Sequence, residues 1–179
     1  FVAFYLVFNL FPLLYTLYLS FFSWDGIGEQ TFVGFANYIR AIQTDALFWT
    51  SIKNVFLIVL GYLPVTLILS FVIAVLLYAR NLRLRRAFQV SMFLPYVVVP
   101  VAVGMLFSMM FSWQSGTVNA LLMRLNIISE PIDWLGSQEF ARSIVIVMQI
   151  WKTFGYVVTL YLSALTSIPR DVSEAATLD

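Results

Sequence analysis

The sequence contains no cysteine and no histidine. Without cysteine the chain forms neither a disulfide nor a thiolate metal site. Without histidine it has no imidazole to bind haem, and it lacks the commonest proton-relay group. It also has no phosphate-binding loop of the GxxxxGK type, so it does not hydrolyse nucleotide by that mechanism. We therefore expect no catalytic residue, no metal and no cofactor bound by this chain.

Charged residues are also scarce, at 11% of the chain against 61% hydrophobic residues. This balance is too apolar for the surface of an ordinary soluble domain. Four apolar stretches, residues 1–24, 54–79, 88–112 and 143–166, are long enough to cross a hydrocarbon core of about 30 Å as helix. They are continuously apolar and do not alternate, which favours helices over barrel strands. The sequence predicts an all-α, polytopic membrane bundle of four spans, in one domain.

The few basic residues indicate how these spans are oriented. Four of the ten basic residues lie in the short connection between the second and third spans: Arg80, Arg83, Arg85 and Arg86. By the positive-inside rule this connection is cytoplasmic, so the connections at residues 25–53 and 114–142 face outward. Four tryptophans lie toward that same side, as an aromatic belt would: Trp24, Trp49, Trp113 and Trp134. The tail after Ser167 then lies inside.

The first outward connection carries local structure signals. Gly26 and Gly28 indicate a turn. Asn37 is a candidate N-cap of a short helix through Ile42, and Asp45 is a candidate N-cap of the run that leads into the second span. We expect interfacial helices in this connection. The acidic residues of the second connection, Glu130, Asp133 and Glu139, have no spacing typical of a metal site or an acid/base pair.

Two prolines interrupt the third span. Pro95 frees the backbone carbonyl of Ser91, and Pro100 frees that of Tyr96, because proline lacks the amide hydrogen that would bond there. The two breaks should bend or loosen this helix. A bent helix with free carbonyls is tolerated where it lines a cavity or is buried in protein, so both a solute path and a simple packing kink fit this pattern.

The fourth span contains one charge, Lys152, about ten residues from its start. A charge at the centre of a spanning helix costs about 2.5 to 3.5 kcal/mol on insertion scales. One interpretation is that Lys152 lines a polar solute path together with Gln149 and Tyr156, which lie at helical spacing from it. The other is that its side chain extends toward the interface and contributes only to packing.

The last residues differ from the apolar run before them. Pro169 suits the first position of a helix, Asp171 adds favourable negative charge in the first turn, and Glu174-Ala175-Ala176 favours helix. A surface helix directly after a span is typical of a segment that contacts a partner protein.

This tail, with Asp179, resembles the start of the EAA signature of ABC importer permeases. Other segments resemble the carbohydrate branch of that family, the maltose, lactose and glycerol-phosphate type: Phe32-Val33-Gly34-Phe35-Ala36-Asn37-Tyr38, Arg86-Ala87-Phe88 before Phe93-Leu94-Pro95, and Gly116 with Asn119 before Trp134-Leu135. The family usually has six spans in this branch. The chain begins at Phe1 inside an apolar run, and about two of the six spans expected from the resemblance would follow Asp179. We therefore interpret the chain as truncated at both ends.

The resemblance implies a transport subunit and not an enzyme. Such a permease lies in the bacterial cytoplasmic membrane and pairs with a second permease subunit, for which the carbohydrate-type segments favour a different chain. It also requires two cytosolic ATPase subunits that use the ATP, and an external solute-binding protein, but no nucleic acid. The segment with Pro169, Glu174, Ala175, Ala176 and Asp179 would be the coupling helix that docks on an ATPase. Two alternatives from other classes are a membrane anchor of a respiratory-type enzyme and a passive channel.

Overall fold

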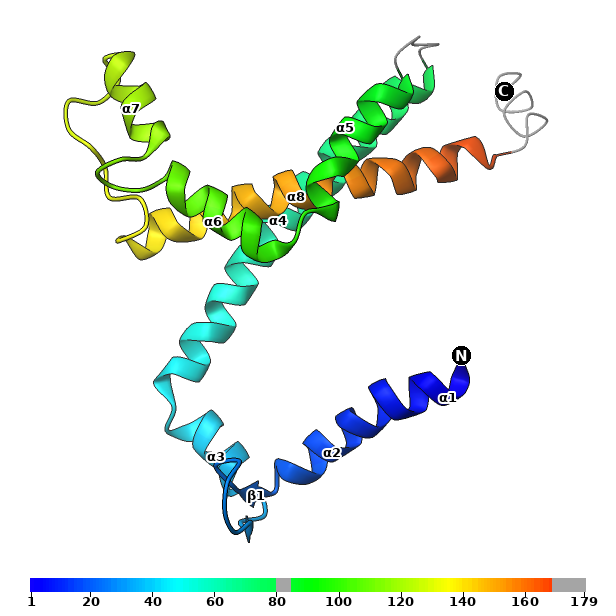
Figure 1. Ribbon diagram of the computed structural model, residues 1–179, viewed down its shortest axis with the longest axis vertical. Helices are drawn as coiled ribbons and strands as arrows, with labels where there is room; N and C mark the ends of the chain where they lie inside the picture. Colours follow the sequence, from blue (N-terminus) through cyan, green and yellow to red (C-terminus); the bar gives the residue numbers. More distant parts are fainter. Residues whose placement is uncertain (80–84, 169–179) are drawn as a thin grey trace. The chain divides into compact units, whose positions relative to one another are not determined.

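The computed structural model describes residues 1–79 and 85–168. The chain divides into two compact units, Phe1–Asn54 and Val55–Asp179, which are described separately below. Figure 1 gives the order of the elements along the chain. The described residues are mostly helical, which confirms the predicted all-α class.

The first unit begins with a helical rod and continues into a small hairpin. The rod consists of α1 (Val2–Tyr5), the π-helical segment η1 (Leu6–Leu10) and α2 (Phe11–Leu19). The hairpin pairs β1 (Phe22–Ser23) with β2 (Thr31–Phe32) in antiparallel register. Gly26 and Gly28 lie between the strands with φ of 93° and 98°, a region that residues with a side chain rarely adopt. The predicted turn is therefore confirmed.

The helix α3 (Ala36–Gln43) follows the hairpin, but Asn37 is not its N-cap. Its side-chain amide instead donates to the carbonyl oxygens of Ser20, over 2.9 Å, and of Phe22, over 3.0 Å. The prediction of a cap was wrong because the amide finds partners seventeen and fifteen positions earlier in the chain. Asp45 does act as predicted: its Oδ1 accepts the backbone N–H of Leu47, over 2.9 Å, at the start of the next helix.

That next helix, α4 (Ala46–Ala79), has 34 residues and contains Pro64. At about 1.5 Å per residue it is about 50 Å long, well beyond a hydrocarbon core of about 30 Å. The predicted span 54–79 is therefore only the apolar part of a longer helix. The first two turns of that helix precede residue 54 and begin directly after the N-cap Asp45.

The third predicted span consists of two helices at a large angle to each other. α5 (Arg85–Val97) and α6 (Pro100–Met110) are bent by 94° across a short break (Figure 1). Val99, at the break, is extended with ψ of 131°, as expected for a residue that precedes proline. The predicted bend thus occurs at Pro100, whereas Pro95 remains inside α5 without breaking it.

Two further helices complete the second unit. α7 (Thr117–Arg124) is short, and α8 (Gln138–Thr166) is long. The hydroxyl of Ser137 caps α8 by accepting the backbone N–H of Phe140 over 3.4 Å. Three helical segments of the described chain, Val2–Leu19, Ala46–Tyr78 and Gln138–Thr166, are long and apolar enough to cross a membrane, and the bent pair α5 and α6 makes a fourth if it counts as one span.

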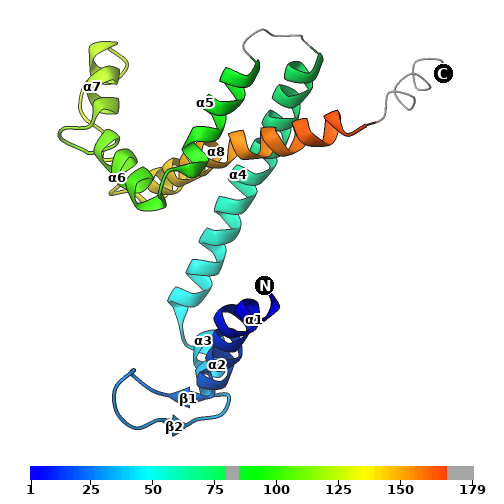
Figure 2. The ribbon, with the colours of Figure 1, turned by 45° about the vertical axis from the view of Figure 1, so that its right-hand side comes forward.

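The packing of the second unit centres on the middle of α8. A side-chain carbon at Gly155 would overlap the backbone carbonyl of Met92, so only glycine lets α5 approach α8 this closely (Figure 2). One residue earlier, the carbonyl of Phe154 accepts the hydroxyl of Ser70, which comes from α4, over 3.1 Å. Four buried side chains form the small core between α4 and α8: Ala74, Leu77, Val158 and Leu162.

Candidate functional site

The candidate site begins with the face of α8 that points away from this core. Gln149, Lys152 and Tyr156 are separated by three and four positions, which places them one above another on one side of the helix. None of the three is buried. Val158 and Leu162, which are buried, project from the opposite side. The residues predicted to line a path in the fourth span therefore share one face.

Tyr156 is held in place by an aromatic contact with α5. Its ring stacks on that of Tyr96 with the ring centres 4.4 Å apart and an angle of 9° between the ring planes. Such a pair contributes about 1 kcal/mol beyond the area it buries. The contact fixes the Tyr156 ring at the edge of the polar face, one helical turn from Lys152.

Pro95 belongs to a different feature. It lines a hollow of about 280 Å³ between α5 and α8, together with Phe88, Ser91, Met92, Trp151 and Phe154. Trp151 and Phe154 project from another side of α8 than Lys152 does. The structure therefore separates Pro95 from Gln149, Lys152 and Tyr156. Pro95 does share its hollow with Ser91, the residue whose backbone carbonyl it leaves without a helical hydrogen bond.

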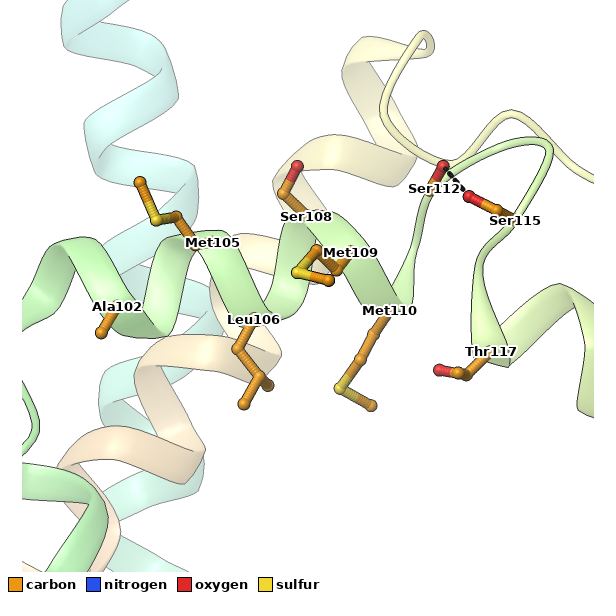
Figure 3. A pocket seen from close by; sticks show the side chains of 9 residues that line it. All are labelled: Ala102, Met105, Leu106, Ser108, Met109, Met110, Ser112, Ser115 and Thr117. Carbon is orange, nitrogen blue, oxygen red and sulfur yellow. Dashed lines mark hydrogen bonds between the residues drawn. The ribbon is translucent and has the colours of Figure 1, made fainter.

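Pro100 is the first residue of α6, and a separate hollow lies along this helix. This hollow of about 920 Å³ runs to the start of α7 and is lined by Ala102, Met105, Leu106, Ser108, Met109, Met110, Ser112, Ser115 and Thr117. Figure 3 shows the hydroxyls of Ser112 and Ser115 directed at each other, and their oxygens are 3.3 Å apart. The hollow is mostly apolar with hydroxyls toward α7, and none of the predicted path residues lines it.

Asn119, which the sequence indicates only through the family resemblance, organises the connection around α7. It is 1% exposed. Its amide nitrogen donates to the carbonyl oxygens of Trp113, over 3.0 Å, and of Ile132, over 2.9 Å. Its oxygen accepts the backbone N–H of Ile132, over 3.2 Å, and the indole N–H of Trp134, over 2.8 Å. A single polar residue in the apolar run 118–123 was the signal that would have revealed it.

The other predicted functional residues lie at or beyond the limits of the described chain. Arg86 is exposed in the first turn of α5, and the backbone of Arg85 begins that helix. Arg80 and Arg83 lie outside the described residues. The same holds for the predicted coupling segment, with Pro169, Glu174, Ala175, Ala176 and Asp179.

Comparison with known proteins identifies the family. The family model described as "Binding-protein-dependent transport system inner membrane component" matches residues 67–179. The chain belongs to this family. The predicted resemblance to importer permeases is thereby confirmed, and the chain is a multi-pass component of an inner membrane.

The curated relatives agree with the predicted carbohydrate branch. The lactose transport system permease protein LacF of Rhizobium radiobacter is 35% identical over 97% of this chain and 57% of its own length. The xylose/arabinose import permease protein XacH of Haloferax volcanii is 32% identical over 92% of this chain and 51% of its own length. The chain thus spans about half the length of the curated relatives it matches.

A solved transporter has the same fold. The bacterial alginate ABC transporter, in complex with a periplasmic protein bound to an alginate pentasaccharide, contains a chain that is 26% identical with a TM-score of 0.78. The match covers 99% of this chain and 58% of that one. The bent pair α5 and α6 and the long helices α4 and α8 therefore belong to an importer permease fold.

Proposed function

We propose that the chain is part of the permease subunit of an ATP-driven ABC importer for a sugar or a related polyol. The observation that carries this proposal is the polar face of α8, with Gln149, Lys152 and Tyr156 near the centre of a helix apolar enough to span a membrane. Polar and charged residues at that depth are costly in lipid, and those that occur there generally face the interior of the bundle or a water-filled path. The sugar transport names of the relatives support the solute class.

The partners follow from the same proposal. A second permease subunit, a different chain, completes the pathway, an extracytoplasmic binding protein delivers the solute, and two cytosolic ATPase subunits use the ATP. This chain itself binds no cofactor. In a bacterial cytoplasmic membrane, the arginine connection at residues 80–86 and the tail after residue 168 lie on the cytoplasmic side, because basic connections remain inside.

The tail, residues 169–179, is the proposed coupling helix. The two alanines allow close approach of an ATPase surface, and the carboxylate of Glu174 pairs with a cation on that surface. When ATP closes the cytosolic subunits, this helix moves, and α8, which precedes it directly in the chain, tilts with it. Such a change requires contacts that differ in strength between the two states.

The test replaces Glu174 in the full-length permease, assembled with its partners in proteoliposomes. Glu174→Lys should abolish ATP-driven sugar uptake or prevent the ATPase subunits from copurifying, because a like charge would face the partner's cation. Glu130→Lys is the matched control: it makes the same charge change in the exposed outward connection and should leave uptake unchanged. Wild-type uptake by the Glu174→Lys permease would contradict the docking role.

The two alternatives predict other results. A membrane anchor of a respiratory enzyme would copurify with a flavin or iron-sulfur protein, and a passive channel would conduct solute without ATP. The family to which the chain belongs does not favour either of them.

A further inference from the structure

The polar face of α8 is longer than the three residues that the sequence singled out. Thr153, Thr159 and Ser163 continue it toward the end of the helix, at positions that fall within the same third of the helix circumference as Gln149 and Tyr156. The face extends over about four helical turns, which is about 21 Å of helix length. It is continuous from the centre of α8 to its C-terminal third.

The hydroxyls on this face have their protons engaged. Thr153 donates to the carbonyl oxygen of Gln149 over 2.7 Å, Thr159 to that of Gly155 over 3.0 Å, and Ser163 to that of Thr159 over 2.9 Å. A hydroxyl that has donated its proton retains lone pairs and can only accept. The face therefore offers acceptors to a solute that brings its own donors, as a polyhydroxylated molecule does.

Lys152 is the one cation on this face between Gln149 and Ser163; Arg142 lies on the same side of α8, two helical turns before Gln149. The described acidic residues of Val55–Asp179 are Glu130, Asp133 and Glu139, all at or before the start of α8. Glu139, on the same helix, is thirteen positions away, which is about 20 Å. Lys152 itself lies fourteen residues from either end of Gln138–Thr166, too far for its side chain to reach an interface directly.

We propose that the solute itself supplies the counter-ion of Lys152, so that the pathway is selective for an anionic, polyhydroxylated solute: a sugar that bears a carboxylate or a phosphate. This proposal rests on the importer function proposed above and names its substrate class. Lys152 is the specificity-determining residue. It pairs with the acid group, while the back-bonded hydroxyls accept the solute's hydroxyl protons and the Tyr156 ring, stacked on Tyr96, offers an apolar surface to the sugar ring.

The first experiment measures the charge selectivity of the face without requiring the natural solute. The chain has no cysteine, so Gln149→Cys introduces a single reactive thiol, three positions from Lys152 and on its outward side. In the full-length transporter, with any cysteine outside this chain replaced by serine, the thiol is labelled from outside. The reagents are methanethiosulfonates of similar size, one carrying a sulfonate and one a trimethylammonium group. Each rate is divided by that reagent's rate with a free thiol in solution.

The anionic reagent should react at least about tenfold faster than the cationic one, because a unit charge about 6 Å away attracts one and repels the other. Lys152→Met should abolish this preference, and Lys152→Arg should retain it. Val147→Cys, exposed on the side of α8 away from Lys152, is the matched control and should show no preference between the two reagents. No labelling at position 149 would show that the face lines no aqueous path and would overturn the proposal.

A preference of the same size with and without the Lys152→Met substitution would also overturn it, because a fixed carboxylate from another subunit or span would then neutralise the lysine. In that case Lys152→Met should instead reduce the amount of assembled transporter. ATP-driven uptake can remain intact in either case, so failure of this proposal is distinguishable from failure of the importer function.

A second experiment separates the acid groups. Glucuronate and glucose 6-phosphate are tested for protection of Gln149→Cys against the anionic reagent, with glucose as the neutral control. Protection by glucuronate alone assigns a carboxylate solute, and protection by glucose 6-phosphate alone assigns a phosphorylated one. Protection by glucose equal to that by the acids, or protection by none of the three, would overturn the substrate class.

Discussion

One side of α8 carries the buried Val158 and Leu162, with the buried Gly155 at its border, whereas the other side carries Gln149, Lys152 and Tyr156, none of which is buried. Val158 and Leu162 pack against Ala74 and Leu77 of α4, and Gly155 lets α5 approach closely. On the polar side, the ring of Tyr156 stacks on that of Tyr96, which comes from α5. Under the proposed function the packed side serves stability and the polar side serves transport, so that substitutions on each side should change different measurements.

The largest effect on stability is expected at the closest helix contact. Gly155→Ala should lower the free energy of unfolding of the full-length permease by about 3 kcal/mol, because the added methyl meets the backbone of Met92, which cannot rotate away. Gly104→Ala, in α6, makes the same change where no atom lies within 4 Å. It should stabilise the helix by roughly 0.5 to 1 kcal/mol. Thermal unfolding of the purified permease in detergent measures both.

Equal unfolding temperatures for the two alanine variants would contradict the close contact of α5 with α8. The buried face would then tolerate a larger residue, and the comparison between the two faces would lose its structural basis.

A smaller effect on stability and a large one on transport is expected on the polar side. Tyr156→Ala removes the stack on Tyr96 and should lower the free energy of unfolding by about 1 kcal/mol. Solute uptake, measured at equal permease abundance, should fall more than tenfold if the ring faces the path. Tyr156→Phe keeps the stack and isolates the contribution of the hydroxyl. Uptake by Tyr156→Ala at the wild-type rate would remove this residue from the path.

Helical spacing predicted which candidate residues share a face, because a regular helix fixes the direction of each side chain. The missing amide hydrogen of proline predicted breaks at Pro95 and Pro100, and the bend occurs at Pro100. Pro95 has the same chemistry and leaves α5 unbroken. The residues before each proline differ: Val97-Val98-Val99 precede Pro100, and β-branched residues favour extended backbone, whereas Leu94 precedes Pro95.

Contacts between residues far apart in the sequence account for what the sequence did not predict. Asn37 binds carbonyls fifteen and seventeen positions earlier instead of capping α3. The four hydrogen bonds of Asn119 and the approach of Met92 to Gly155 likewise depend on how separate segments meet. Such partners leave no periodic pattern in a single sequence. Only an isolated polar residue or glycine in an apolar run indicates where to look.

The smallest expected effect tests a polar group on the packed side. Ser70→Ala removes a hydroxyl that is fully buried and donates to the carbonyl of Phe154, across the contact of α4 with α8. The loss should be roughly 0.6 kcal/mol, as is typical for hydrogen bonds between membrane helices. Ser143→Ala is the control, because that hydroxyl bonds only to its own helix, at the carbonyl of Glu139. Unfolding temperatures measure both variants. If the two are equally stable, the hydrogen bond between α4 and α8 contributes nothing measurable, and the packed face depends on close apolar contact alone.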